Sequence, residues 1–178
     1  AQTLLDLSKP NTALGKDQIV TQDVFAATAK NPRYSEGSIV ALADGRLLFA
    51  TTEFADSASD FAKARIIGRT SSDGGVSWGE SRVLQKSVGK LNVMSVTMLR
   101  LTDEGPYSGP IGMFYLVKNA HDDLDVWLKV STDEGKTFGD SVLVTNQPGY
   151  HVMNNDRVQR LSSGRLVVPV ASTSDVSK

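Results

Sequence analysis

The 178-residue chain contains no cysteine, which excludes disulfide bonds, thiolate metal ligands and a cysteine nucleophile. It also lacks an excess of either charge, because 19 Lys and Arg stand against 20 Asp and Glu, giving a net charge of −1. Nucleic-acid-binding proteins usually carry a basic surface, so the sequence predicts no nucleic-acid partner. The longest apolar run, Ile111 to Val117, is far shorter than the ~20 residues of a membrane-spanning helix. We therefore expect no membrane partner.

Histidine is scarce too, with only His121 and His151 in the chain. Asp122 and Asp123 follow the first of them, but the two histidines are not spaced i, i+2 or i, i+4 as a local metal motif requires. The sequence therefore predicts no metal site and no cofactor. Exposed loop histidines, or histidines that hydrogen-bond to a sugar, are the remaining interpretations.

The start of the chain, Ala-Gln-Thr without Met, is typical of a mature protein after a signal peptidase has cut behind small residues. A chain trimmed at this point would begin in the same way. The pattern favours a secreted or periplasmic bacterial protein. Residues 1–17 show no clear periodicity and are predicted to form a surface lead-in.

Two similar turns, SSDGGVSW at 71–78 and STDEGKTF at 131–138, begin 131 − 71 = 60 residues apart. A turn repeated at a fixed period indicates a repeated supersecondary unit. In each turn we expect the Asp side chain to bond backbone N–H groups two residues on, the Gly to supply a positive φ and the aromatic ring to be buried. These structural residues are Ser71, Asp73, Gly75, Trp78, Ser131, Asp133, Gly135 and Phe138.

Short strand patterns flank the turns, with Asp44-Gly45 as the clearest hairpin signal. The predicted strands are Ser38–Leu42, Arg46–Thr51, Arg65–Thr70, Ser81–Gln85, Ser95–Leu101, Ile111–Val117, Asp125–Val130, Ser141–Thr145, Arg157–Leu161 and Arg165–Ala171. Each period thus holds four strands, as in a propeller blade.

Within a propeller domain of residues 18–178, the first blade is predicted at about 33–88 and the second at about 91–147. A third begins at about 151 and is incomplete, because the next copy of the turn is due near residue 191. We therefore expect a second chain or a further C-terminal segment to complete the propeller. A self-contained β-sandwich of about ten strands is the alternative.

The repeated turns resemble the Asp-box of the bacterial sialidases and their relatives. The run from Leu47 to Asp60 and the strand Gly164–Val170, which contains Pro169, are also similar to that family. The resemblance implies an all-β fold, a six-bladed β-propeller of four-stranded antiparallel blades, of which this chain supplies about the first two and a half to three. It also implies an exo-glycosidase that hydrolyses a terminal acidic sugar, with sialic acid first among the candidates.

By the same resemblance, Asp60 is the catalytic general acid/base, and a Tyr nucleophile is expected outside this chain. The chain departs from the family at Arg33, which lies about two residues early, and at Phe54, which stands where a second Arg is expected. A carboxylate is best held by several Arg forks, so the sugar could differ from sialic acid.

Loops that enter innermost strands and loops that join second and third strands share one face of a propeller. This places a set of polar residues near Asp60 as predicted substrate-binding groups: Arg33, Glu36, Asn92, His121, Asn155, Asp156 and Arg157. The structural alternatives are a helix N-cap at Asp60 and a surface ion pair between Arg33 and Glu36. For Arg157 the alternative is a structural bond to Asp156 or to a loop carbonyl. A non-catalytic propeller that binds glycan or protein, and a glycosidase or lyase for another acidic sugar, are the other functional hypotheses.

Overall fold

The first sheet contains four antiparallel strands in chain order: β1 (Arg33–Ala41), β2 (Leu47–Phe54), β3 (Ala64–Ser71) and β4 (Arg82–Gln85). The structure is a computed structural model that describes residues 21–102 and 107–173, so the predicted lead-in at 1–17 lies outside the described residues. All the secondary-structure elements within those ranges are strands. The predicted all-β fold of four-stranded antiparallel sheets is confirmed.

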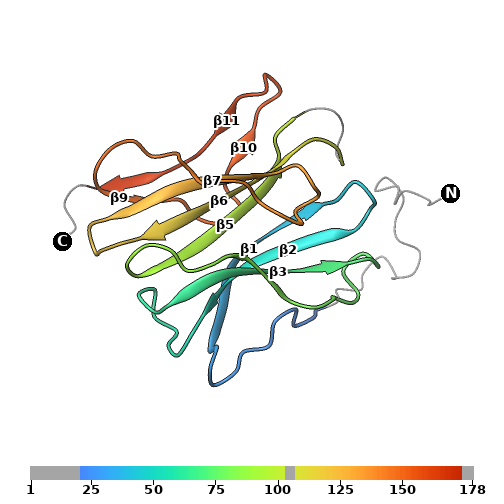
Figure 1. Ribbon diagram of the computed structural model, residues 1–178, viewed down its shortest axis with the longest axis horizontal. Coiled ribbons are helices and arrows are strands. Elements are labelled where there is room, and N and C mark those ends of the chain that lie inside the picture. Colours follow the sequence, from blue (N-terminus) through green and yellow to red (C-terminus); the bar gives the residue numbers. More distant parts are fainter. Residues whose placement is uncertain (1–20, 103–106, 174–178) are drawn as a thin grey trace.

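The second sheet repeats this order with β5 (Asn92–Arg100), β6 (Ile111–Lys118), β7 (Leu124–Ser131) and β8 (Val142–Leu143). All eight residues of β6 are buried, because the strand has neighbouring layers on both faces. An apolar run without polar alternation is the pattern expected of such a strand. Figure 1 shows the first sheet below the second, and β1 packs against β5 between them.

The third unit has shorter strands: β9 (Tyr150–Val152), β10 (Gln159–Arg160), β11 (Leu166–Val167) and β12 (Ala171–Thr173). β10 pairs with β11, and β9 pairs with β12, so the unit is one hairpin with a gap in each arm. The predicted strand 165–171 is interrupted at Pro169, which has no N–H to donate. β9, which the sequence did not predict, also touches β7 through Tyr150 and Leu124.

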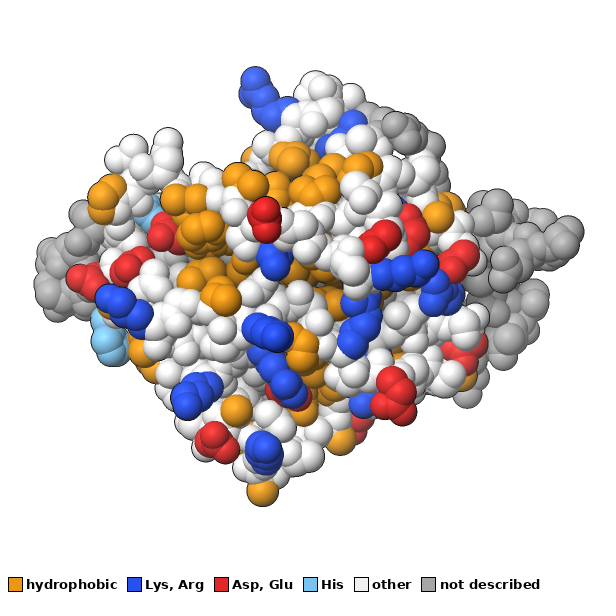
Figure 2. Space-filling view, viewed as in Figure 1, with side chains coloured by type: hydrophobic (Ala, Val, Ile, Leu, Met, Phe, Trp, Pro, Cys, Tyr) orange, Lys and Arg blue, Asp and Glu red, His pale blue; other side chains and the backbone are white. Residues whose placement is uncertain are grey.

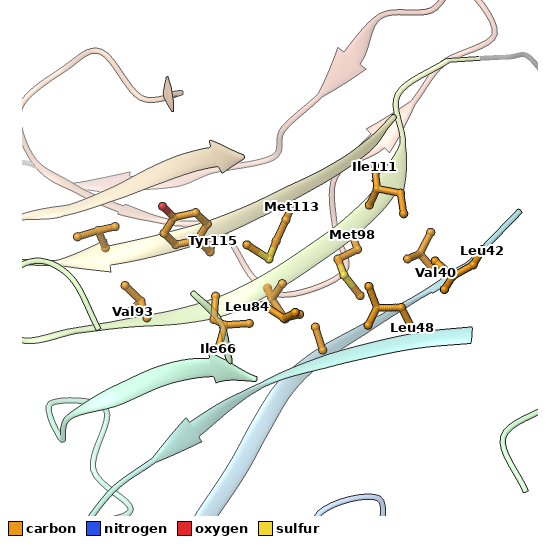
Figure 3. Close-up of a cluster of buried hydrophobic side chains, with 13 residues drawn as sticks. Val40, Leu42, Leu48, Ile66, Leu84, Val93, Met98, Ile111, Met113 and Tyr115 are labelled. Atoms are coloured by element: carbon orange, nitrogen blue, oxygen red, sulfur yellow. The ribbon is translucent and has the colours of Figure 1, made fainter. Parts of the chain in front are cut away.

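The main core lies between the first two sheets. Figure 3 shows Leu48 and Ile66 of the first sheet pointing toward Met113 of the second. All three side chains have no exposed surface, so each contributes about 1.5–3 kcal/mol of burial free energy. A second cluster, which includes Phe114 and Met153, joins the second sheet to the third unit.

The innermost arm of each unit contains one non-glycine residue in the left-handed region, on β1, on β5 and between β9 and β10. Glu36, Ser95 and Asp156 have φ values of 61°, 62° and 56°. They lie 95 − 36 = 59 and 156 − 95 = 61 residues apart, which matches the period of the turns. In the first two units the residue opens a β-bulge, where two residues of one strand oppose one of its partner. Since Glu, Ser and Asp share no obvious motif, this repeat could not be predicted from the sequence.

The bulges also explain why β1 and β5 begin earlier than predicted. Each bulge lets the pairing continue beyond it, so β1 starts at Arg33 rather than Ser38, and β5 at Asn92 rather than Ser95. Arg33, Glu36 and Asn92, which were predicted to lie in entering loops, therefore lie on strands. A strand holds a side chain more firmly than a loop does, which matters for Arg33.

The two repeated turns are held by the same hydrogen bonds. In the second turn, the Ser131 hydroxyl donates to Asp133 at 2.8 Å and accepts from the Gly135 amide at 2.8 Å. Asp133 accepts bonds from the amide and the hydroxyl of Thr137, four residues on rather than two. The corresponding residues of the first turn are Ser71, Asp73, Gly75 and Ser77.

The aromatic residues that end these turns are partly buried. Trp78 meets the Phe49 ring edge-on, with 5.8 Å between ring centroids, and Phe138 packs against the main core. Each turn therefore fastens the end of its hairpin to a neighbouring strand or sheet.

Candidate functional site

An ion pair joins Arg33, the first residue of β1, to Asp60 in the loop between β2 and β3. The Arg33 Nη1 atom donates to the Asp60 carboxylate at 2.5 Å and to the Ala58 carbonyl at 3.0 Å. Its Nε donates to Ser35 Oγ at 2.9 Å, and the guanidinium lies 4.4 Å from the centroid of the Phe54 ring. Arg33 is thus held on four sides, while 55% of the Asp60 side chain remains exposed.

Glu36 is the second carboxylate beside Arg33, with 3.9 Å between its Oε1 and Nη2 of the Arg. The Thr52 hydroxyl donates to the other carboxylate oxygen at 3.4 Å. Burial raises the pKa of Glu36; the Arg33 charge opposes that shift and the Asp60 charge adds to it. Glu36 is therefore a second, partly buried carboxyl group next to the ion pair, and its pKa is raised.

Two fully buried side chains support the Asp60 loop from behind. Asn92 Nδ2 donates to the Asp60 carbonyl at 2.9 Å and to the Ala62 carbonyl at 2.7 Å. Lys118 Nζ donates to the same Asp60 carbonyl at 3.1 Å. Asn92 has no exposed surface, so it lies behind the predicted site and positions the loop.

Aromatic rings surround the Lys118 ammonium. Its Nζ lies 4.3 Å from the centroid of the Phe61 ring and 5.6 Å from that of Tyr150, distances typical of cation–π contacts. The His121 ring packs against the same Phe61 ring, with 4.3 Å between the two ring centroids. His121 thus contacts the loop that carries Asp60.

His151 lies apart from this group. Its ring is buried, with Nδ1 2.8 Å from Ser172 Oγ and Nε2 2.7 Å from the Gln147 carbonyl. It ties β9 to β12. Residues 21–102 and 107–173 contain no group of three His, Cys, Asp or Glu side chains placed to bind a metal ion. Nor do they contain a helix long and apolar enough to cross a membrane.

The predicted residues of the third unit are used differently from one another. Asn155 donates to the Gly37 carbonyl at 3.0 Å, and Asp156 accepts from Ser38 Oγ at 2.8 Å, so both tie the third unit to the bulge of β1. Arg157 is exposed, and its guanidinium bonds to no residue in the described part of the chain. Of the three, Arg157 is the one whose side chain has no bonding partner in the described ranges.

The tyrosines with shifted pKa values do not suit nucleophilic chemistry. Tyr34 donates to Glu53 at 3.1 Å on the face of the first sheet that points away from the second. Burial raises its pKa and the Glu53 charge raises it further. Burial also raises the pKa of Tyr115, whose hydroxyl contacts Ser141. An activated nucleophile requires the opposite shift.

The structure thus brings Arg33, Glu36 and Asp60 together at one site, with Asn92 behind them and His121 against the same loop. Sequence reasoning missed Lys118 and the support by Ser35. A lysine that ends the apolar run 111–117 is a signal for a buried, partnered cation, because an unpaired one is costly.

Comparisons with solved structures give the fold a context. A Hadza microbial sialidase superposes with a TM-score of 0.66 at 15% identity, over 80% of this chain and 33% of that one. A protein of unknown function from Dyadobacter fermentans gives 0.65 at 16% identity, over 86% and 50%. Trypanosoma rangeli sialidase, as its covalent intermediate with 2,3-difluorosialic acid, gives 0.60 at 18% identity, over 78% and 26%.

A scan against protein-family models and a search of curated proteins produced no match. The chain spans between 26% and 50% of the length of the three structures named above. At 15–18% identity these likenesses establish the fold alone. The chain therefore has a sialidase-like fold, and its four-stranded sheets are blades of a β-propeller.

Proposed function

We propose that this chain belongs to a sialidase-like exo-glycosidase that hydrolyses a terminal acidic sugar, with sialic acid as the first candidate. Asp60 is the general acid/base, and Arg33 contacts the sugar carboxylate. The observation that carries the proposal is the Arg33–Asp60 pair, which places a half-exposed carboxyl group and a fixed guanidinium within one hydrogen bond of each other. A Tyr nucleophile from a second chain or a further segment completes the reaction in this proposal.

The pair suggests how binding prepares the acid. A substrate carboxylate that binds the Arg33 fork competes with Asp60 for the same N–H groups. Once Asp60 loses this partner, its carboxyl group is free to turn toward the leaving glycosidic oxygen and to act there as the general acid. Arg33 thus links recognition of the acidic sugar to acid catalysis.

Asp60→Asn in the complete protein tests the proposal. We expect release of sialic acid from a fluorogenic sialoside to fall by about 10²–10⁴-fold, the usual contribution of a general acid, while sialoside binding is retained. Asp56→Asn is the matched control, because Asp56 is exposed on the same loop and has a φ of 61°, which Asn tolerates. Equal turnover by the two variants would refute the role of Asp60.

A non-catalytic glycan-binding propeller is the second candidate, and Phe54 is the observation that favours it. Its ring lies beneath Arg33, where a second Arg was expected, so the site has one fixed Arg fork instead of two. Such a protein would bind sialosides saturably and release no sugar during long incubation. A panel of other acidic glycans separates both hypotheses from a glycosidase or lyase with a different substrate.

A further inference from the structure

A cavity of about 460 Å³ is lined in part by Ala55 and Lys63, which flank the Asp60 loop. Its lining includes Glu53 and Arg65, which face each other across β2 and β3. The residues that follow them on these strands, Phe54 and Ile66, belong to the buried clusters. Because side chains alternate along a strand, Glu53 and Arg65 point away from the second sheet. The cavity is therefore separate from the candidate catalytic site.

Positive charge dominates this cavity. Its lining includes four cationic side chains and one carboxylate: Lys30, Lys63, Arg65, Lys86 and Glu53. Glu53 already accepts bonds from Arg65 and from Tyr34, so its charge is engaged. The three lysine ammonium groups form no ion pair with any described residue. Lys and Arg side chains also lie over the lower part of the molecule in Figure 2, where Figure 1 places the first sheet.

The lysines project from a fixed backbone. The Lys30 carbonyl accepts from the Asp56 amide at 2.8 Å, and the Lys63 carbonyl accepts from the Ala55 amide at 2.8 Å. The Lys86 carbonyl accepts from the Gln85 side chain at 2.8 Å. Three like charges thus extend from fixed main-chain positions around one hollow, and an anion in that hollow would relieve their repulsion.

The chemistry of the lining selects among anions. A planar carboxylate prefers an Arg fork that offers two N–H groups, and the Nε edge of Arg65 is already bonded to Glu53. Lysines act as point charges and suit a tetrahedral oxyanion that carries several acceptor oxygens. The volume lies within the range of small-molecule sites, and the 40% exposed Val83 adds an apolar contact for a sugar ring. We propose that this basic cavity binds a sugar that carries a sulfate or phosphate ester.

Calorimetric titration of the purified protein with N-acetylglucosamine 6-sulfate, its 6-phosphate and unsubstituted N-acetylglucosamine tests this site. We expect the two esters to bind, the neutral sugar to bind at least tenfold more weakly, and ester affinity to fall as NaCl is raised. The two esters distinguish sulfate from phosphate as the preferred group. Inorganic sulfate tests whether the sugar contributes, and equal affinity for the free ion would overturn the sugar part of the proposal.

Variants locate the site. Lys63→Gln and Lys86→Gln should each weaken ester binding by about tenfold, since each removes a charge-assisted bond from an exposed position. Lys136→Gln, an exposed lysine on the second repeated turn, should leave the affinity unchanged. Arg33→Gln should leave it unchanged as well. Absence of ester binding, loss of binding in Arg33→Gln, or equal affinities in the three lysine variants would overturn the proposal.

Discussion

Lys118 donates a 3.1 Å hydrogen bond to the main-chain carbonyl of Asp60, although Lys118 is only 1% exposed and lies 58 residues away in the sequence. This buried cation is held by Phe61 and Tyr150 as well as by the carbonyl. It connects the end of β6 in the second sheet to a loop of the first sheet. The candidate acid therefore lies on a loop whose position depends on the neighbouring blade.

Lys118→Met should separate loop order from global stability. Methionine fills a similar volume without a buried charge, so the free energy of unfolding should change by less than about 1.5 kcal/mol. The Asp60 loop loses one support, so amides of Ala55 to Ala62 should exchange with solvent faster. Hydrogen exchange measured by mass spectrometry, with denaturant unfolding alongside, checks both effects. Exchange as slow as in Lys90→Met, an exposed control, would contradict the assigned role.

The repeated turns should make the protein sensitive to acid. Bonds from the Ser77 hydroxyl and amide lower the pKa of Asp73 from 3.8 to about 2, and those from Thr137 do the same for Asp133. A depressed pKa stabilises the folded state above 3.8, and this contribution is lost as the pH falls toward about 2. Unfolding midpoints measured between pH 5 and pH 2 should therefore drop more steeply than in a variant with both Asp73→Asn and Asp133→Asn. Parallel curves would contradict this prediction.

Glu36 should have the opposite pH dependence. Burial raises its pKa above the ordinary value of 4.5, so the folded state favours the protonated form more than the unfolded chain does. The stability that Glu36 contributes is present below 4.5 and is lost as the pH rises through the raised pKa. Glu36→Gln cannot ionise and should lose less stability across that range. Urea unfolding of both proteins from pH 4 to pH 7 measures the difference between their free energies of unfolding. A difference that stays constant across this range would rule out the raised pKa.

Arg100 and Glu134 join the second repeated turn to the inner hairpins, with Nη1–Oε1 and Nη2–Oε2 distances of 2.9 and 2.7 Å. Glu134 also accepts from the Ala43 amide at 2.7 Å. Because the Arg100 side chain is only 9% exposed and that of Glu134 is 30% exposed, Glu134→Gln should cost about 1–2 kcal/mol of unfolding free energy. The exposed residue Glu80 supplies the control Glu80→Gln, which should change stability by no more than about 0.5 kcal/mol. Denaturant titration that gives equal values for the two variants would contradict the prediction.

The sequence by itself determined the strand order and the period of this protein, because both depend on local chemistry. Hydrophobic alternation and Asp-Gly turns act over a few residues, so β2, β3, β6 and β7 could be predicted to within three residues at either end. The two hydrogen-bonded turns, 60 residues apart, could be recognised for the same reason, since the Ser, Asp and Gly residues of each turn lie within four residues of their bonding partners.

Only the tertiary structure decided how the site is built. The bulges at Glu36 and Ser95 depend on pairing between strands and have no common residue type, so the early starts of β1 and β5 were not predictable. The sequence pattern predicted a loop at Arg33, but Arg33 is the first residue of a strand, and this position lets it pair with Asp60. Long-range burial converted Asn92 from an expected sugar ligand into a support for the loop. Such contacts join segments that are far apart in the chain, where local sequence patterns carry no information.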